Sequence, residues 1–292
     1  MNFWDKIFLK GIKKFPYGSL QIHFGSGSDL SCSYSLSQAK HQLFTKSYSR
    51  KFRNYCQQTL PTHSITTEPL RQIVSDFTIS IDPQGCTDID DAISIRSDTS
   101  SSETPCFTVG IHITDVLSRL ESLPTEFHSE LIQHLYSKTT TLYTPNTNIK
   151  HNLLPASISC EQSSLVARQS RPVWSLMITL STNQKNSLTD SIPEFSIQKT
   201  WFQLSMIKVI KNFTYEQIDQ RLAQPICKKN QQIHQLFTIS QFLSTKNSTS
   251  QWDSHQMVES FMIVMNQEVA RIISSQQSRL PRNILPIFRT QP

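Results

Sequence analysis

The sequence predicts an α+β fold in which a mixed sheet is flanked by helices. Two observations predict it: short runs of β-branched and apolar residues recur through the first two thirds of the chain, and helical spacings of apolar residues follow in the last third. The strand-like runs are separated by segments rich in Ser, Thr, Asp and Pro. We therefore expect strands at 77–81, 92–96, 106–113, 173–181 and 195–209, and helices at 214–223, 229–244 and 255–275.

The last expected helix has the clearest pattern. Its apolar residues recur at intervals of three and four, which places them on one face of the helix. We expect this face to pack on the core, through Val258, Phe261, Met262, Met265, Val269 and Ile272.

The first 75 residues carry the positive charge of the chain, which is +6 overall. They hold ten Lys or Arg against three Asp or Glu, whereas the remaining residues hold eighteen against nineteen. Residues 3–15 combine apolar residues near helical spacing with lysines, which predicts a short basic amphipathic helix. A basic segment suits a polyanionic partner, and a solubilising terminus is the alternative that stays open.

Composition also bounds the compartment. No stretch approaches the ~20 consecutive apolar residues of a membrane span. The six cysteines form no Cys-x-x-Cys pair, and no secretory signal precedes them. We therefore expect a soluble protein with reduced thiols, located in the cytoplasm or the nucleus.

Four aspartates fall within ten residues: Asp82, Asp88, Asp90 and Asp91. Carboxylates this close repel one another, so their pKa values rise unless a cation neutralises them. The cluster lies between two apolar strand-like runs, where uncompensated charge is costly. A hard divalent cation with oxygen ligands is the natural neutraliser, which predicts a Mg²⁺ or Mn²⁺ site.

Two other interpretations of the cluster can be weighed. A solvated acidic loop is the common fate of clustered aspartates, and it stays open. An EF-hand calcium loop needs Gly at its sixth position and Glu at its twelfth. Counted from Asp82, these positions hold Thr87 and Ile93, so the EF-hand is excluded.

The segment from Asp82 to Ala92 resembles the signature of the RNase II/RNB exoribonucleases, and its Gly-Cys-Thr-Asp-Ile-Asp-Asp wording is closest to the catalytic exonuclease subunit of the exosome. Further matches follow in the family's order, and the resemblance covers roughly residues 68–292. They are Val109–Val116, Thr141–Tyr143, Leu153–Pro155, Ser164-Leu165 with Arg171, Phe213–Glu216, Met257–Met262 and Phe288–Pro292.

The resemblance implies an RNB-type catalytic domain over 61–292, preceded by a basic N-terminal region over 1–60. That region combines the amphipathic helix with a candidate remnant of an OB-like domain, too short for a complete OB fold. Family members continue past the last matching element, so the resemblance implies a domain incomplete at its C-terminus. The missing half would then come from another chain or from an exosome-like complex.

The resemblance also assigns roles. Asp82, Asp88 and Asp91 would be the ligands of Mg²⁺ or Mn²⁺, and Asp90 would serve the chemical step by orienting water or a second ion. Tyr143 matches the tyrosine that stacks on the terminal nucleotide, whereas spacing alone would favour a buried core tyrosine. His112 lies in an apolar strand-like run, and we interpret it as structural.

These roles predict a metal-dependent hydrolytic 3′→5′ exoribonuclease that acts on single-stranded RNA and releases nucleoside monophosphates. Two alternatives stay open: a catalytically weak or inactive RNA-binding or scaffold protein, and one fragment of a split RNB enzyme. The intact aspartates favour the enzyme. Val209 and Lys211 replace small residues of the family pattern, and they favour the non-catalytic protein.

Overall fold

The computed structural model describes residues 47–58, 71–98, 105–138, 140–143, 150–182, 195–244 and 252–276, together with 32, 33, 36, 37 and 40. The chain divides into two compact units. The first consists of Met1–Tyr48 with Ser129–Leu153, and the second of Ser49–His128 with Leu154–Pro292. The expected amphipathic helix at 3–15 lies outside the described residues.

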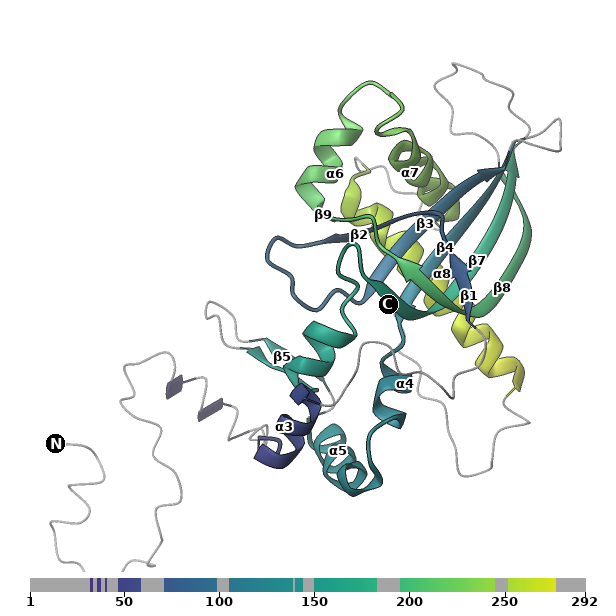
Figure 1. Ribbon diagram of the computed structural model, residues 1–292. Helices are drawn as coiled ribbons and strands as arrows, with labels where there is room; N and C mark the ends of the chain where they lie inside the picture. Colours follow the sequence, from purple (N-terminus) through teal and green to yellow (C-terminus); the bar gives the residue numbers. More distant parts are fainter. Residues whose placement is uncertain are drawn as a thin grey trace, which may run out of the picture. The chain divides into compact units, whose positions relative to one another are not determined.

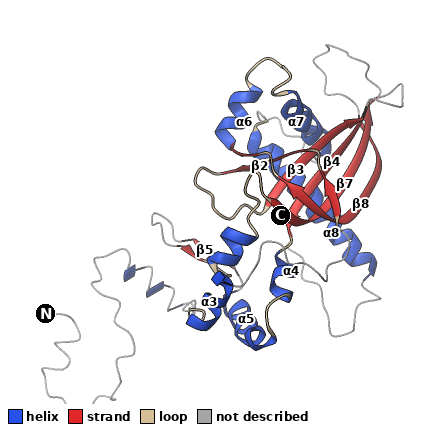
Figure 2. Cartoon of the chain, in the orientation of Figure 1, coloured by secondary structure: helices blue, strands red, loops and turns tan. Residues whose placement is uncertain are grey.

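The second unit is built on a mixed, seven-stranded sheet with the order β1-β8-β7-β4-β3-β2-β9 (Figure 1, Figure 2). Strands β2, β3, β4, β7 and β8 pair antiparallel along the sheet, whereas β1 pairs with β8 and β9 with β2 in parallel. The strands are β1 (Gln72–Val74), β2 (Phe77–Asp82), β3 (Asp91–Asp98), β4 (Cys106–Thr114), β7 (Ser170–Thr182), β8 (Phe195–Lys208) and β9 (Lys211–Thr214).

Two short breaks curl this sheet. Residues 75–76 separate β1 from β2, and residues 209–210 separate β8 from β9. The segment β1–β2 runs parallel to the segment β8–β9 on both sides of the breaks, because β1 pairs with β8 and β2 pairs with β9. Between these pairs, the Ile210 N–H donates to the Thr78 carbonyl at 2.8 Å. Because β1 and β9 stand at opposite ends of the strand order, this pairing draws the ends of the sheet toward each other.

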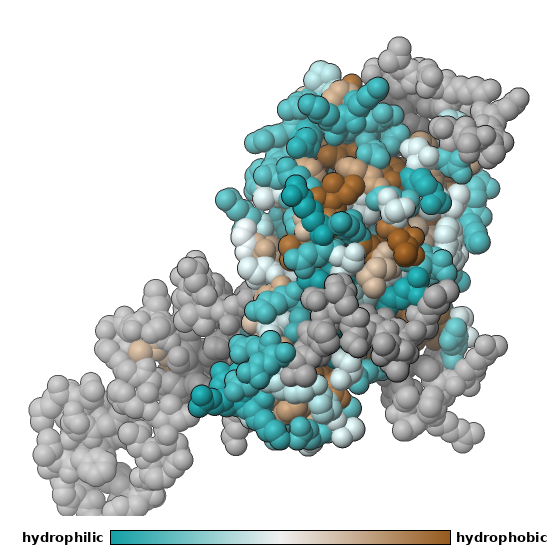
Figure 3. Space-filling model, viewed as in Figure 1, coloured by the Kyte–Doolittle hydropathy of each residue, from teal (hydrophilic) through white to brown (hydrophobic). Residues whose placement is uncertain are grey.

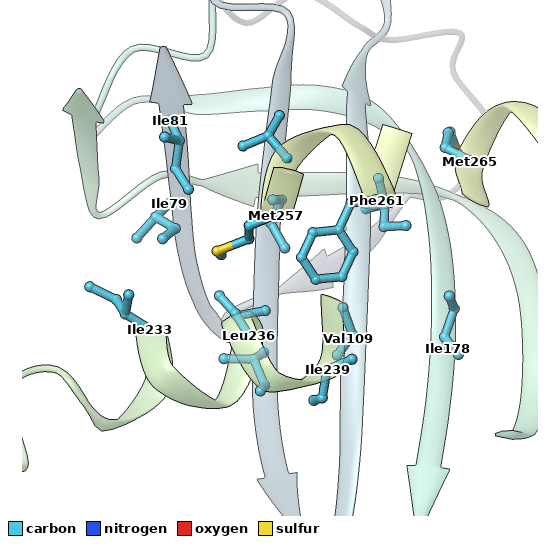
Figure 4. Close-up of a cluster of buried hydrophobic side chains, with 14 of the residues drawn as sticks. Ile79, Ile81, Val109, Ile178, Ile233, Leu236, Ile239, Met257, Phe261 and Met265 are labelled. Carbon is cyan, nitrogen blue, oxygen red and sulfur yellow. The ribbon is translucent and has the colours of Figure 1, made fainter. Parts of the chain in front are cut away.

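One face of the sheet is apolar and packs on three helices, α6 (Tyr215–Leu222), α7 (Gln231–Leu243) and α8 (Ser254–Gln276). Alternate residues of the strands supply the sheet side of this core, as the two-residue strand period requires. Figure 4 shows Phe261 of α8 pointing toward the strands, with Leu236 and Ile239 of α7 beside it. The strand residues in this core include Ile79, Ile81, Ile93, Ile95, Val109, Ile111, Leu176, Ile178 and Leu180.

The other face carries small and polar side chains. His112 is fully buried there, with its Nδ1 2.7 Å from the Ser175 Oγ and its Nε2 2.8 Å from the Ser94 Oγ. Burial lowers the pKa of His112 to about 3, so the ring is neutral at physiological pH. The structural interpretation of His112 agrees with this position.

The expected strands and helices are confirmed, with ends shifted by at most three residues. Six elements were not predicted from the sequence: α3 (Arg50–Gln58), α4 (Val116–Glu121), α5 (Thr125–Lys138), the π-helical turn η1 (Ser157–Gln162) and the short strands β1 and β9. These elements are short or weakly periodic, so local pattern does not identify them. On α8, Val258, Phe261 and Met265 are buried, and Met262 and Val269 pack against the same core, as expected. Ile272, which was also expected there, is half-buried and is not part of this core.

Some apolar side chains remain at the surface. Ile73 of β1 is 82% exposed and Ile210, just before β9, is 52% exposed. Figure 3 shows such apolar side chains among hydrophilic ones on the face that carries β1 and β9. Among the helices that the structure describes, none is long and apolar enough to cross a membrane.

In the first unit, Tyr48 contacts the segment Ser129–Leu153. Its hydroxyl donates to the Leu153 carbonyl at 2.8 Å, and its ring lies 4.0 Å from that of His134. The Lys138 ammonium donates to the Asn152 carbonyl at 3.2 Å. The two-stranded sheet of β5 (Leu142–Tyr143) and β6 (Lys150–His151) completes the described part of this unit.

The buried histidine leads to a stability prediction at Gly110. A Cβ at this position would lie 2.5 Å from the Ser94 Oγ and 2.6 Å from the His112 ring, both held by their mutual hydrogen bond. Gly110→Ala should therefore lower the free energy of unfolding by about 1–3 kcal/mol. Ser196→Ala, on an exposed stretch of β8, should change it by less than about 0.5 kcal/mol. Urea melts measure both, and equal midpoints for the two variants would contradict this packing.

The aspartate loop as a candidate active site

The four aspartates lie in and beside the loop that joins β2 to β3. Asp82 is the last residue of β2, Asp91 is the first of β3, and residues 83–90 form the loop between them. A turn begins the loop: the Cys86 N–H donates to the Pro83 carbonyl at 3.1 Å, and Gly85 has a φ of 81°. Glycine reaches this left-handed conformation without the strain that a side chain would add.

The loop is anchored through Ile89, the residue between Asp88 and Asp90. Its side chain is buried in a cluster that we call the Ile89 cluster, and its N–H donates to the Ser164 Oγ at 3.0 Å. The Ile89 carbonyl accepts from the Leu165 N–H at 2.9 Å. With Ile89 fixed inward, Asp88 is half-buried and Asp90 is exposed. The cluster consists of Val74, Ile89, Ala92, Leu165, Val173, Ile207 and Val209.

The end of the loop is held by β4. The Thr114 N–H donates to the Asp90 carbonyl at 2.9 Å, and the Thr114 hydroxyl donates to the Ser163 carbonyl at 2.6 Å. Thr114 is the last residue of β4. Its hydroxyl therefore adds a connection between β4 and the segment that holds Ile89.

Asn212 connects β2 to the segment that anchors Ile89, and it was not predicted from the sequence as a site residue. Its amide nitrogen donates to the Ser80 Oγ at 2.9 Å and to the Leu165 carbonyl at 3.0 Å. The Ser80 hydroxyl in turn donates to Asp82 Oδ2 at 2.9 Å. Asn212 thus orients a hydrogen-bond donor toward one of the aspartates. The signal was weak, because a single Asn next to a β-like run usually marks a turn.

Arg171 holds the segment of Ser164 and Leu165, which anchors Ile89. Its Nε donates to the Ser164 carbonyl at 3.0 Å, and its Nη2 donates to the Glu161 carbonyl at 2.8 Å. The guanidinium is buried, so these bonds also satisfy donors that have no access to water. The Ser164-Leu165 and Arg171 elements of the family resemblance therefore belong to one scaffold under the aspartate loop.

The aspartates interact electrostatically. Burial, followed by the charges of Asp82 and Asp90, raises the pKa of Asp91 to about 7. Burial also raises the pKa of Asp82, an effect that the Ser80 hydrogen bond opposes and the charge of Asp88 reinforces. The mutual repulsion that the sequence analysis expected is thus present, and burial is the larger cause.

Tyr215, the first residue of α6, also interacts electrostatically with the aspartates. Burial raises the pKa of its hydroxyl first, and the charges of Asp91 and Asp82 raise it further. Its ring stacks on that of His255, with centroids 3.9 Å apart and an angle of 8° between the planes. Tyr215 lies within the Phe213–Glu216 match to the family, but the sequence alone predicted no role for it at the site.

The donor chemistry of the loop fits a hard divalent cation. Four carboxylates supply oxygen ligands, and two of them carry pKa values that a bound cation would lower. As the side chains are placed, however, no group of three or more His, Cys, Asp or Glu in the described part of the chain is arranged to hold an ion. Metal binding by Asp82, Asp88 and Asp91 therefore stays a prediction that requires their carboxylates to converge.

Tyr143 lies in β5 of the first unit, where it pairs with Lys150. Its side chain lies outside the described part of the structure. Its predicted contact with RNA stays a prediction.

Comparison with known proteins places this loop in a family. The RNB domain model matches residues 70–251, a segment that contains the four aspartates. The chain belongs to the RNB family. This confirms the resemblance to RNase II/RNB exoribonucleases and the expected RNB-type fold.

Solved RNB structures share the fold at low sequence identity. RNase R of Mycoplasma genitalium, in complex with ribose-methylated single-stranded RNA, matches with a TM-score of 0.64 and 17% identity over 87% of this chain and 41% of its own. An active-site mutant of the Dss1 exoribonuclease of Candida glabrata matches with a TM-score of 0.61 and 17% identity over 88% of this chain and 36% of its own. The chain thus spans about two fifths of the length of these relatives.

The raised pKa of Asp91 predicts a pH-dependent stability. Folded Asp91 binds its proton up to about pH 7, whereas an unfolded Asp releases it near pH ~3.9. The stability of the wild type should therefore fall as pH rises from ~4 to ~7 and should stay lower above that range. In EDTA, Asp91→Asn should raise the unfolding free energy by a few kcal/mol at pH 8 and by almost nothing near pH ~4.

Thermal melts of both proteins across this pH range measure the effect. Asp98→Asn, at the far end of the same strand, is the control and should show no such divergence. A constant difference between wild type and Asp91→Asn at all pH values would contradict the raised pKa.

Proposed function

We propose that this RNB-family protein is a metal-dependent hydrolytic 3′→5′ exoribonuclease that acts on single-stranded RNA and releases nucleoside 5′-monophosphates. The observation that carries the proposal is the electrostatic state of the aspartate loop. Two of its carboxylates have raised pKa values, and hydrogen bonds from three neighbouring segments hold the loop in place. A protein gains little stability from such a charge cluster, so a function that uses a cation accounts for it best.

In this proposal Asp82, Asp88 and Asp91 hold Mg²⁺ or Mn²⁺. The bound ion would neutralise charge on the phosphoryl oxygens and would acidify a water molecule. Two observations support this proposal: the Ser80 hydroxyl donates to Asp82 Oδ2, and Asp91 stands at the start of β3. Because a metal ligand must be deprotonated, binding of the ion by Asp91 should strengthen as the pH rises through about 7.

Asp90 is proposed to serve the chemical step. It is the exposed member of the cluster, and its backbone is fixed by Thr114 and by the buried neighbour Ile89. Its carboxylate would accept a hydrogen bond from the attacking water and orient that water toward phosphorus. The water oxygen then bonds to phosphorus, the bond from phosphorus to the 3′ oxygen breaks, and a proton passes to that leaving oxygen.

The substrate side of the proposal rests on stacking and charge. Tyr143 is proposed to stack on a base near the 3′ end, an interaction worth roughly 1–3 kcal/mol per base. The positive excess of the first 75 residues is proposed to attract the phosphate backbone. The basic segment adds affinity without sequence preference, as suits an exonuclease.

A non-catalytic RNA-binding protein is the second candidate. The observation that favours it is that the described carboxylates are not arranged as a set of three around one point. Binding of RNA would then rest on the basic segment and on Tyr143.

Metal binding can be tested by thermal melts. Mg²⁺ or Mn²⁺ should raise the melting temperature of the wild type, because an ion that binds the folded state stabilises it by mass action. Asp90→Asn should keep most of the shift, and the double variant Asp82→Asn with Asp91→Asn should lose it. Asp98→Asn should behave as wild type. No shift in the wild type would exclude the metal site.

Hydrolysis can be tested on a 5′-labelled single-stranded RNA with Mg²⁺, separated on a denaturing gel. Asp90→Asn should slow 3′ shortening by about 10²–10⁴-fold, the usual cost of removing a positioned proton acceptor. Asp98→Asn is the matched control and should keep the wild-type rate. Because the solved relatives are more than twice as long, a parallel arm adds the remaining part of an RNB enzyme in trans.

The outcomes separate the two candidates. Shortening that depends on Asp90 in either arm supports the exoribonuclease. RNA binding without shortening in both arms favours the non-catalytic protein, and shortening that survives Asp90→Asn points to a contaminant.

A further inference from the structure

The sheet carries a hollow to which the aspartate loop does not contribute. A hollow of about 180 Å³ opens beside the β1–β2 break, lined among others by Asp76, Arg96, Thr108, Met177, Trp201 and Gln203. Arg96 follows Asp91 by five residues on β3, which places Arg96 roughly 17 Å along the strand from the aspartate loop. None of the four aspartates of the candidate active site lines the hollow.

The hollow offers a buried carboxylate. The Asp76 side chain is only 6% exposed, and its partner Arg96 is 59% exposed with 3.4 Å between Nη1 and Oδ1. A carboxylate accepts about four hydrogen bonds when fully satisfied. Among the described residues, this long contact with Arg96 is the one bond to the Asp76 carboxylate, so it can accept further donors from a ligand.

The hollow also offers an aromatic wall that is held in place. The Trp201 Nε1 donates to the Gln203 Oε1 at 2.9 Å, and the Gln203 amide donates to the Ser205 Oγ at 3.0 Å. Ser205 is fully buried, so this chain of bonds fixes the indole from inside the sheet. A fixed aromatic face binds a flat ring with little loss of side-chain entropy.

Cations stand at the rim. The Lys199 ammonium lies 4.9 Å from the centroid of the Trp201 ring, and Lys199 is exposed. The exposed Arg96 guanidinium stands beside Asp76. An anionic group that extends out of the hollow would meet one or both of them.

We propose that this hollow binds a guanine base that carries a 5′-phosphate. Guanine is flat, and its N1–H and exocyclic amino group present two donors side by side, which match the two oxygens of one carboxylate. The base would stack on Trp201, its two donors would reach Asp76, and the phosphate would lie outside near Lys199 and Arg96. Adenine and the pyrimidines lack this pair of donors.

The volume agrees with this assignment. Sites for complete drug-sized ligands occupy about 300–1,000 Å³, so a hollow of about 180 Å³ suits one base with its sugar and phosphate outside. The guanine can come from free GMP or from a guanosine within single-stranded RNA, since both present the same edge. The site does not depend on the proposed nuclease activity.

Isothermal titration in EDTA tests the proposal, because chelation removes metal-mediated binding at the aspartate loop. The full chain is titrated with GMP, with IMP, which lacks the exocyclic amino group, and with AMP. GMP should bind at least about tenfold more tightly than IMP, because one hydrogen bond to a charged group is lost, and AMP should bind more weakly still. A parallel series uses short RNAs with one guanosine or with adenosine alone.

Variants locate the binding. Trp201→Leu should weaken GMP binding roughly 5–100-fold, as expected for a lost stacking contact. Asp76→Asn should abolish the preference for GMP over IMP. Trp174→Leu, on the adjacent strand and on the opposite face, is the matched control and should bind GMP as the wild type does. Asp90→Asn should also leave it unchanged.

Each outcome decides the proposal. A guanine preference seen with GMP identifies the free nucleotide, and one seen with RNA alone identifies the nucleic acid. No guanine preference with either ligand, or a preference that survives both Asp76→Asn and Trp201→Leu, overturns the site. If these variants fail to fold, the surface double variant Lys199→Gln with Arg96→Gln decides. It should remove the advantage of GMP over guanosine, and an unchanged advantage overturns the site.

Discussion

The candidate active site depends on the burial of Ile89. The residue on each side of it, Asp88 or Asp90, carries a carboxylate, so without this anchor the loop would be drawn into water. The Ile89 side chain inserts into an apolar cluster instead, and both of its backbone groups are bonded to Ser164 and Leu165. Because successive side chains of an extended chain point in opposite directions, burial of Ile89 turns Asp88 and Asp90 outward. The outward positions of Asp88 and Asp90 follow from this burial.

The sheet separates two kinds of packing. Its helix-covered face is filled mainly by isoleucine, leucine and valine of the strands, which pack on apolar residues of α6, α7 and α8. Its other face holds neutral His112 between two serines, above a glycine that cannot accept a side chain. The polar atoms of this histidine and the two serines satisfy one another within the protein.

The departures from the family pattern have local explanations. Val209 is buried in the Ile89 cluster, where its methyl groups fill space beside the loop. The Lys211 ammonium lies 4.7 Å from the centroid of the Phe213 ring, so a cation–π contact holds it at the surface. These replacements therefore fit the fold, and they do not by themselves remove a carboxylate from the site.

The sequence by itself determined the class of fold, the main strands and helices, and the four aspartates, because these follow from periodicity and from residue type. It could not determine how the loop is held. Asn212 and Ser80 lie 132 positions apart, and only the parallel pairing of β2 with β9 brings them together. Nor could it assign Tyr215 to the site, since its interaction with Asp82 and Asp91 depends on the path of α6 after β9. The hollow at Trp201 likewise exists because β1 and β8 meet across the curled sheet. Such contacts are long-range, and they arise when burial of the apolar face selects one topology among those that the local patterns allow.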